Sequence, residues 1–391
     1  MYRFLAIIFS LVIILTSPVQ AARGKNLELS ADSAILIEAT TGRVIYEKNA
    51  DERRPPASMT KMMTCILGLE YLTPEDRVKV SQEAAYTEDS EMALQEGDII
   101  SAGELLRGVM LVSDNGGAVA VAEAVSGSVS DFSKLMNDKA REIGCTDTNF
   151  ENPNGLPNDM HLSTARDMAK IAAYCLDNWD FRDIVSTQRE TIHWINPSNH
   201  SMRVENTNKL LGTYKGTTGV KTGWTNAAGG CLAASAKRGG IELIAVVMHS
   251  EDAYTRFDDA QTLLDYGFEQ VTSIYGIDKN QVEKKIFVSG GEQATLEVGL
   301  EDDLNYALLR NEYRQNLTVE YDLPKVIEAG TGIKVGDTVG TATLKYNGKV
   351  VAAVPFVAKE DVEEGFSIAS MIVTLTEPFI DVAQDFLLLL A

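Results

Sequence analysis

The chain has 391 residues, of which 45% are hydrophobic and 23% are charged. That is more than one average domain and enough apolar content for a sizeable core, so we expect two domains. The formal net charge of −21 argues against nucleic acid or an anionic membrane surface as a charge-driven partner, because such binding needs clustered Lys and Arg.

The first 21 residues resemble a secretory signal. Arg3 gives a short positive start, Phe4–Leu15 is almost wholly apolar, and Val19-Gln20-Ala21 ends in small residues around a polar one. This apolar run is too short to span a bilayer comfortably, so we predict a signal peptide over residues 1–21, with cleavage after Ala21 or Ala22. An uncleaved anchor is the alternative. Either reading predicts an exported protein.

The body of the chain predicts a sheet covered by helices. Residues 33–48 read as two short strands around a Thr-Gly turn. From Ser58 to about Leu72 the apolar pattern is helical, and further helices are predicted over 101–125, 129–143, 163–176 and 255–266. Segments 219–223, 230–236 and 241–248 are strand-like. Strands at both ends with helices between them predict one sheet built from distant segments, and we assign residues 22–274 to this domain.

The pattern of predicted secondary structure changes near Tyr275. From there to about Thr376 it predicts short strands and turns, including a hairpin at Tyr346-Asn347-Gly348-Lys349, so we assign residues 275–376 to a separate all-β domain. Residues 377–391, EPFIDVAQDFLLLLA, can form a short amphipathic helix that lies at a membrane surface. Asp381 and Asp385 weaken that interpretation, and a packed or frayed terminal helix remains an equal alternative.

Cysteine and histidine give little support to metal chemistry. The spacings of Cys65, Cys145, Cys175 and Cys231 match neither a metal site nor a dense disulfide framework. Cys65 and Cys175 lie in apolar helical stretches, which favours buried thiols. The four histidines form no HxxxH or HxH pair. We therefore expect no metal and no cofactor.

Ser58 and Lys61 form the first candidate for chemistry. At the start of a helix, residues three apart share a face, so the Lys61 amine can reach the Ser58 hydroxyl. A serine is a poor nucleophile until a base takes its proton, and a lysine can be that base only if burial or a second cation lowers its pKa. An SxxK pattern is expected about once by chance in a chain of this length, so it needs support from elsewhere.

Two further motifs follow in order. Ser113-Asp114-Asn115 puts a hydroxyl and a carboxamide on one side of a turn, suited to relaying a proton and holding a substrate amide, or simply to capping a helix. Lys221-Thr222-Gly223 lies on a predicted strand, where alternation sends the first two side chains to opposite faces unless the strand is distorted. Gly223 would let a substrate backbone approach closely.

The three motifs together resemble the penicillin-recognising serine enzymes. The likeness is greatest to the low-molecular-mass penicillin-binding proteins that are D-alanyl-D-alanine carboxypeptidases. It covers nearly the whole chain, through ENPNGLPNDMHLSTARDMAKIA, GTTGVKTGWTNAAGGCLAASA and the β-rich KVGDTVGTATLKYNGKVV. It implies an α/β (α+β) penicillin-binding/β-lactamase-like transpeptidase domain with an antiparallel sheet, followed by a small all-β domain. It also implies a place in the bacterial cell envelope.

The resemblance also implies roles for single residues. Ser58 is the nucleophile that attacks the penultimate D-Ala, and Lys61 is its base. Ser113 passes the proton to the leaving amine, and Asn115 holds Lys61 and the substrate. Lys221 adds positive potential. Among the remaining residues, Thr222 and Arg256 bind the terminal carboxylate, and the backbone N–H groups of Ser58 and Trp224, which follows Gly223, form the oxyanion hole. The implied partners are peptidoglycan stem peptides ending in D-Ala-D-Ala and, as covalent inhibitors, β-lactams.

Two alternatives are considered. A class A β-lactamase carries Ser-Asp-Asn and a deacylating glutamate some three dozen residues later, where Glu151 lies. Here Glu151 opens an Asn-Pro-Asn-Gly-Leu sequence typical of the carboxypeptidases, and the β-rich domain has no place in a β-lactamase. A non-catalytic envelope-binding protein with the same fold is the other alternative. The presence of all catalytic positions argues against it.

Overall fold

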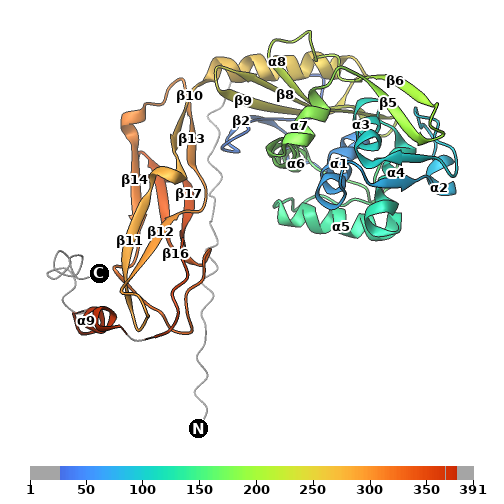
Figure 1. Ribbon diagram of the computed structural model, residues 1–391. Coiled ribbons are helices and arrows are strands. Elements are labelled where there is room, and N and C mark those ends of the chain that lie inside the picture. Colours follow the sequence, from blue (N-terminus) through green and yellow to red (C-terminus); the bar gives the residue numbers. More distant parts are fainter. Residues whose placement is uncertain (1–26, 366, 377–391) are drawn as a thin grey trace.

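The computed structural model describes residues 27–365 and 367–376. Figure 1 shows a part made of a sheet and helices, and an elongated β-rich part that extends away from one end of helix α8. The predicted signal peptide (residues 1–21) and terminal helix (residues 377–391) lie outside the described residues.

The larger part is organised around an antiparallel five-stranded sheet with the strand order β2-β1-β9-β8-β7. Its strands are β1 (Ser33–Glu38), β2 (Val44–Lys48), β7 (Thr217–Thr225), β8 (Gly229–Arg238) and β9 (Ile241–Ser250). The predicted hairpin over 33–48 is confirmed as β1 and β2. Strands from the two ends of this segment lie side by side, as expected, and β7 is an edge strand.

Helices cover both faces of this sheet. They are the 3-10 turn η1 (Ala57–Thr60) and the α-helices α1 (Lys61–Tyr71), α2 (Gln82–Ala85), α3 (Ala102–Leu111), α4 (Asn115–Ser126), α5 (Val129–Glu142), α6 (Ala165–Asp177), α7 (Trp179–Ser186) and α8 (Thr255–Gln270). Strand alternation sends Ile35 and Ile37 into a core with α1, α3, α4 and α6, and Ala34 and Leu36 into a second core under α8. Figure 1 shows this sandwich, with α8 on the opposite side of the sheet from α1 and α6.

One helix prediction is wrong. Residues 101–125 form two helices, α3 and α4, because Ser113 adopts a left-handed backbone conformation with φ of 66° and Asp114 caps a new helix at Asn115. Gly116 and Gly117 lie in the first turn of α4. The break places the Ser113–Asn115 segment at a turn that faces η1.

Two smaller features complete this part. Strands β3 (Arg77–Lys79), β4 (Ile99–Ser101), β5 (Arg189–Asn196) and β6 (Ser201–Glu205) form a four-stranded sheet beside α3. All four cysteines are free and buried, as predicted for Cys65 and Cys175.

The β-rich part contains a two-stranded and a six-stranded sheet. The strands are β10 (Val271–Ile277) and β13 (Leu304–Leu309), and then β14 (Leu317–Asp322), β16 (Thr338–Tyr346), β17 (Lys349–Ala358), β12 (Thr295–Leu300), β11 (Glu283–Ser289) and β15 (Val326–Glu328) in sheet order. The short turns η2 (Lys279–Gln281) and η3 (Arg314–Asn316) join them. The hairpin predicted at Asn347-Gly348 is confirmed, with positive φ at both residues. The boundary predicted at 274/275 falls inside β10.

The last described element, α9 (Ile368–Thr376), differs from the prediction of strands and turns up to residue 376. It packs Val373 against Phe287 of β11 and Ala294. Among the described residues, no helix is long and apolar enough to cross a membrane.

Candidate active site

Ser58 lies in η1, the single 3-10 turn that leads into α1. The turn is pressed against edge strand β7: a Cβ on Gly223 would come within 3.0 Å of the Pro56 carbonyl oxygen and 3.2 Å of the Met59 nitrogen. The absence of a side chain at Gly223 therefore lets η1 pack directly against the strand backbone. The close approach of a substrate backbone at this glycine stays a prediction. Ser58 itself is partly exposed, so its hydroxyl is accessible from solvent.

Lys61, in the first turn of α1, is fully buried and has three polar neighbours. Its Nζ lies 3.0 Å from Ser58 Oγ, 2.6 Å from Asn115 Oδ1 and 2.7 Å from the Asn154 carbonyl oxygen. The two carbonyl oxygens can only accept hydrogen bonds, whereas a serine hydroxyl can also donate one. A neutral amine fits this arrangement, because its two N–H groups serve the carbonyls and its lone pair accepts the Ser58 proton.

The electrostatics favour that neutral state. Burial lowers the pKa of Lys61 to about 7, against the opposing effect of the Asp114 carboxylate. An exposed lysine, with a pKa near 10.4, would be almost wholly protonated at neutral pH. Lys61 is therefore available as a base over a substantial part of the neutral range.

The turn between α3 and α4 supplies the second motif. Asn115, the first residue of α4, directs Oδ1 at Lys61 and donates from Nδ2 to the Glu88 carbonyl oxygen at 3.0 Å. These two contacts fix the orientation of the carboxamide. Ser113, two residues earlier, is partly exposed, whereas Asp114 between them is fully buried.

Strand β7 supplies Lys221, which is almost fully buried. Its Nζ donates to the Thr222 carbonyl oxygen at 3.1 Å. Burial, together with repulsion from Lys61 and Arg256, holds the pKa of Lys221 well below its usual value. The environment of Lys221 therefore disfavours a positive charge unless an anion binds beside it.

Thr222 forms a contact that sequence reasoning missed. Its hydroxyl lies 2.7 Å from the hydroxyl of Thr207, whose backbone N–H donates to the Leu111 carbonyl oxygen at the end of α3. Thr207 thus joins β7 to the helix that precedes Ser113. Only its place in Asn206-Thr207-Asn208, a cluster of residues typical of turns, could have drawn attention to it.

Arg256, in the first turn of α8, lies behind the same strand. It is mostly buried, and its Nη1 donates to the Gly223 carbonyl oxygen at 2.7 Å. Burial lowers its pKa, and within the described part of the chain its buried Nε has no hydrogen-bond partner. The guanidinium group therefore holds the backbone of β7 next to Trp224, whose side chain is largely exposed.

A loop over residues 151–162 closes the site beneath Lys61. Its Asn154 carbonyl binds the base, and its Pro153 carbonyl accepts a hydrogen bond from Thr64 of α1 at 2.5 Å. Gly155 has φ of 85°, and a Cβ there would lie 2.0 Å from the Ala57 carbonyl oxygen. This loop carries part of the family resemblance, but its backbone contact with the base was not predicted, because a main-chain acceptor is independent of residue type.

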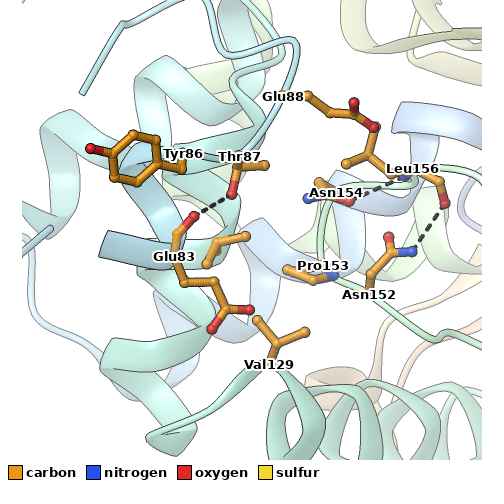
Figure 2. Close-up of a pocket in the computed structure, with 10 residues that line it drawn as sticks. Glu83, Tyr86, Thr87, Glu88, Val129, Asn152, Pro153, Asn154 and Leu156 are labelled. Carbon is orange, nitrogen blue, oxygen red and sulfur yellow. Dashed lines mark hydrogen bonds between the residues drawn. The ribbon is translucent and has the colours of Figure 1, made fainter. Parts of the chain in front are cut away.

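A cavity of about 340 Å³ lies on the other side of this loop (Figure 2). Asn152, Pro153, Asn154 and Leu156 form one wall, and the segment from Glu83 to Glu88 forms the other. Ser58 does not line it. The cavity borders the two segments whose carbonyl groups, at Asn154 and Glu88, hold Lys61 and Asn115.

Glu151 does not take the position of a deacylating base. Its side chain is exposed and accepts a hydrogen bond from Asn149 Nδ2 at 2.7 Å, while its backbone N–H donates to His161 Nδ1 at 3.0 Å. The loop presents a backbone carbonyl to the site in place of a carboxylate. This arrangement speaks against the β-lactamase alternative.

Comparison with known proteins agrees with this geometry. A family model described as D-alanyl-D-alanine carboxypeptidase matches residues 19–252, and one described as the C-terminal domain of penicillin-binding protein 5 matches residues 272–364. D-alanyl-D-alanine carboxypeptidase DacF of Bacillus subtilis is 36% identical over 347 residues, 88% of each chain. DacC of Escherichia coli is 31% identical over 374 residues, 91% of each chain.

Solved structures show the same likeness. Penicillin-binding protein 5 from Haemophilus influenzae matches with a TM-score of 0.71 and 28% identity, covering 87% of this chain and all of that one. The predicted fold, a mixed domain with an antiparallel sheet followed by an all-β domain, is confirmed. The chain belongs to the family of serine-type D-alanyl-D-alanine carboxypeptidases.

Proposed function

We propose that this chain removes the terminal D-alanine from peptidoglycan stem peptides through an acyl-enzyme on Ser58. Ser58 Oγ attacks the carbonyl carbon of the penultimate D-Ala while its proton passes to the lone pair of Lys61. The observation that carries the proposal is the 3.0 Å contact between Ser58 Oγ and a buried amine whose other two neighbours can only accept hydrogen bonds.

The tetrahedral intermediate then breaks down by expelling the amine of the terminal D-Ala. That amine must leave protonated, and we infer that the Ser113 hydroxyl, on the turn beside Asn115, relays the proton from Lys61. Water next attacks the ester on Ser58, with Lys61 again taking a proton, and restores the serine. The net reaction consumes one water and releases one D-alanine.

Two groups of β7 would bind the terminal carboxylate of the substrate. Lys221 has one acceptor, so its remaining N–H groups are free to face an anion, and the Thr222 hydroxyl can donate to the same carboxylate. The charge of Arg256, behind Gly223, strengthens the positive potential there. A carboxylate also supplies the counter-charge that Lys221 lacks in the free enzyme.

The oxyanion would lie between the backbone N–H groups of Ser58 and Trp224. Strand β7 pairs with β8 on one side only, so alternate N–H groups of β7 point away from the sheet towards η1. The close packing of η1 on Gly223 supports this pair of donors, because it brings the two backbone segments together. A preformed donor of this kind contributes about 3–4 kcal/mol to transition-state stabilisation in comparable enzymes.

Ser58→Ala tests the proposal. The wild-type protein, incubated with a muropeptide pentapeptide, should yield the tetrapeptide by mass spectrometry, and a fluorescent penicillin should label it. The Ser58→Ala protein should do neither while keeping its circular dichroism and melting temperature. Labelling of the variant at the wild-type level contradicts the assignment of the nucleophile, and an unlabelled wild type would favour the non-catalytic alternative.

We also propose that the protein acts outside the cytoplasmic membrane, in the cell envelope. The predicted signal peptide and the nature of the substrate support this location, and contact of residues 377–391 with a membrane stays a prediction. Fractionation of cells, with N-terminal sequencing of the mature protein, tests both export and cleavage after Ala21 or Ala22.

A further inference from the structure

Asp114 is a fully buried carboxylate at the centre of the second motif. It caps α4: Oδ1 accepts from the Gly117 N–H at 2.5 Å, and Oδ2 accepts from the Met92 N–H at 2.6 Å. The first bond is an ordinary helix cap. The second reaches a different segment, so the carboxylate joins α4 to the chain over residues 87–92.

Two further bonds make the same connection. Asn115 Nδ2 donates to the Glu88 carbonyl oxygen, and the Gly116 N–H donates to Ser90 Oγ at 2.8 Å, which in turn donates to the Thr87 carbonyl oxygen. Three consecutive residues of the turn are therefore fastened by hydrogen bonds to residues 87–92, a segment whose first two residues, Thr87 and Glu88, line the cavity in Figure 2. The position of Asn115, which holds Lys61, depends on these hydrogen bonds.

The charge of Asp114 also acts on Lys61. The charged or titratable groups around the pair are Lys221 on β7, Arg256 on α8, His161 on the loop and Glu91 on the fastened segment. Burial raises the pKa of Asp114, while its two backbone hydrogen bonds and Lys61 favour the anion. The N-terminus of α4 favours it too. An anion here opposes the effect of burial on Lys61.

We propose that Asp114 is a positioning residue that sets the pH range of the base: it holds Asn115 against Lys61 and supplies a negative charge that acts on that amine. The inference rests on the proposed function, since it takes Lys61 as the base of Ser58. A neutral residue at this position would leave Lys61 deprotonated at lower pH, and a residue without acceptors would also loosen the turn.

Asp114→Asn separates the charge from the packing, because the two effects have opposite signs. Removing the negative charge lowers the pKa of Lys61, so the rise of the acylation rate with pH moves to lower pH, by roughly one pH unit. If Asp114 only packed the turn, its loss would admit water to Lys61 and move the rise to higher pH. The measurement is the rate of acylation by a fluorescent penicillin between pH 5 and 10.

Glu91→Gln is the matched control. It removes an exposed carboxylate from the same segment, and within the described residues that carboxylate forms no hydrogen bond to α4. Its profile should coincide with that of the wild type. If the acylation rate of Asp114→Asn rises at the same pH as that of the wild type, or at a higher pH, the inference is overturned. If Asp114→Asn does not fold, Asp114→Ser, a neutral cap, replaces it with the same expected direction. A wild-type rate that does not rise with pH counts against the proposed function instead.

Discussion

Lys61 and Lys221 are two buried amines in one site, and repulsion from Lys61 contributes to the lowered pKa of Lys221. The structure identifies burial as the main cause of the lowered pKa of each. The sequence could predict a neutral base from the residue types alone, because a lysine serves as base only when its pKa falls. The part of Lys221 in lowering the pKa of Lys61 stays a prediction.

Replacing Lys221 by Gln should move the rise of the acylation rate to higher pH and weaken binding of the substrate carboxylate. Removal of a neighbouring positive charge makes protonation of Lys61 easier, so its pKa rises. Lys221→Arg should keep the position of the rise better, since it keeps the charge. Acylation rates measured against pH decide this. If the acylation rates of both variants rise at the same pH as that of the wild type, Lys221 only binds the substrate.

Thr207 should affect substrate binding through Thr222. If the Thr222 hydroxyl donates to the substrate carboxylate, it must accept its 2.7 Å hydrogen bond from Thr207. Thr207→Val removes that donor and should raise KM about fivefold with little change in kcat, since such a bond contributes about 1 kcal/mol. Thr207→Ser should restore KM. A fall in kcat at unchanged KM contradicts this role.

At the scale of elements, the site is built where elements begin. Ser58 precedes α1, Asn115 opens α4 and Arg256 lies in the first turn of α8, while Lys221 lies on an edge strand. The order and type of these elements could be predicted from apolar periodicity and turn residues. Around Ser113 these two signals disagree: the apolar pattern of residues 101–125 predicts one helix, whereas Ser113-Asp114-Asn115 indicates a turn, and the cap by Asp114 produces the break. Backbone contacts, such as that of the Asn154 carbonyl oxygen with Lys61, could not be predicted from residue types either.

Gly155→Ala tests the loop as an element of the site. Its left-handed conformation and the contact with the Ala57 carbonyl leave no room for a methyl group, so η1 must shift. A displacement of about 1 Å at a reacting group costs on the order of a hundredfold in rate. Acylation by penicillin should therefore fall by that order.

Gly144→Ala is the control for the backbone cost. Gly144 has nearly the same φ, 84°, with nothing within 4 Å of the added Cβ. It should lower the free energy of unfolding by about 1 kcal/mol and leave acylation unchanged. Equal acylation by the two variants would show that the loop does not position η1.

At the scale of the whole molecule, Arg43 connects the two parts. In the turn between β1 and β2, it binds both oxygens of Glu312 at 2.5 and 2.8 Å and the Ala307 carbonyl oxygen, and it stacks on Tyr306. Burial raises the pKa of Glu312, but bonds from Arg43 and the Leu309 N–H lower it by more. The stabilisation is therefore present at neutral pH and is lost as pH falls through this lowered pKa.

Arg43→Ala should uncouple the two parts. The partly buried Glu312 would lose its partner, so we expect the temperature of the first calorimetric transition to fall and the two parts to unfold separately, while D-Ala release from a soluble peptide stays unchanged. Arg189→Ala, which breaks an exposed ion pair with Glu205, should change stability by less than about 1 kcal/mol. A single unshifted transition for Arg43→Ala would show that this contact does not couple the parts.

The central claim is that buried, neutral Lys61 is the base of Ser58, and the acylation rate of the wild-type protein against pH tests it most directly. The second-order rate of labelling by a fluorescent penicillin, measured from pH 5 to 10, should rise through an apparent pKa of about 7 and then level off, because only the deprotonated amine can take the serine proton. A rate that is constant across this range, or that rises only near pH 10, as for an exposed lysine, contradicts the account.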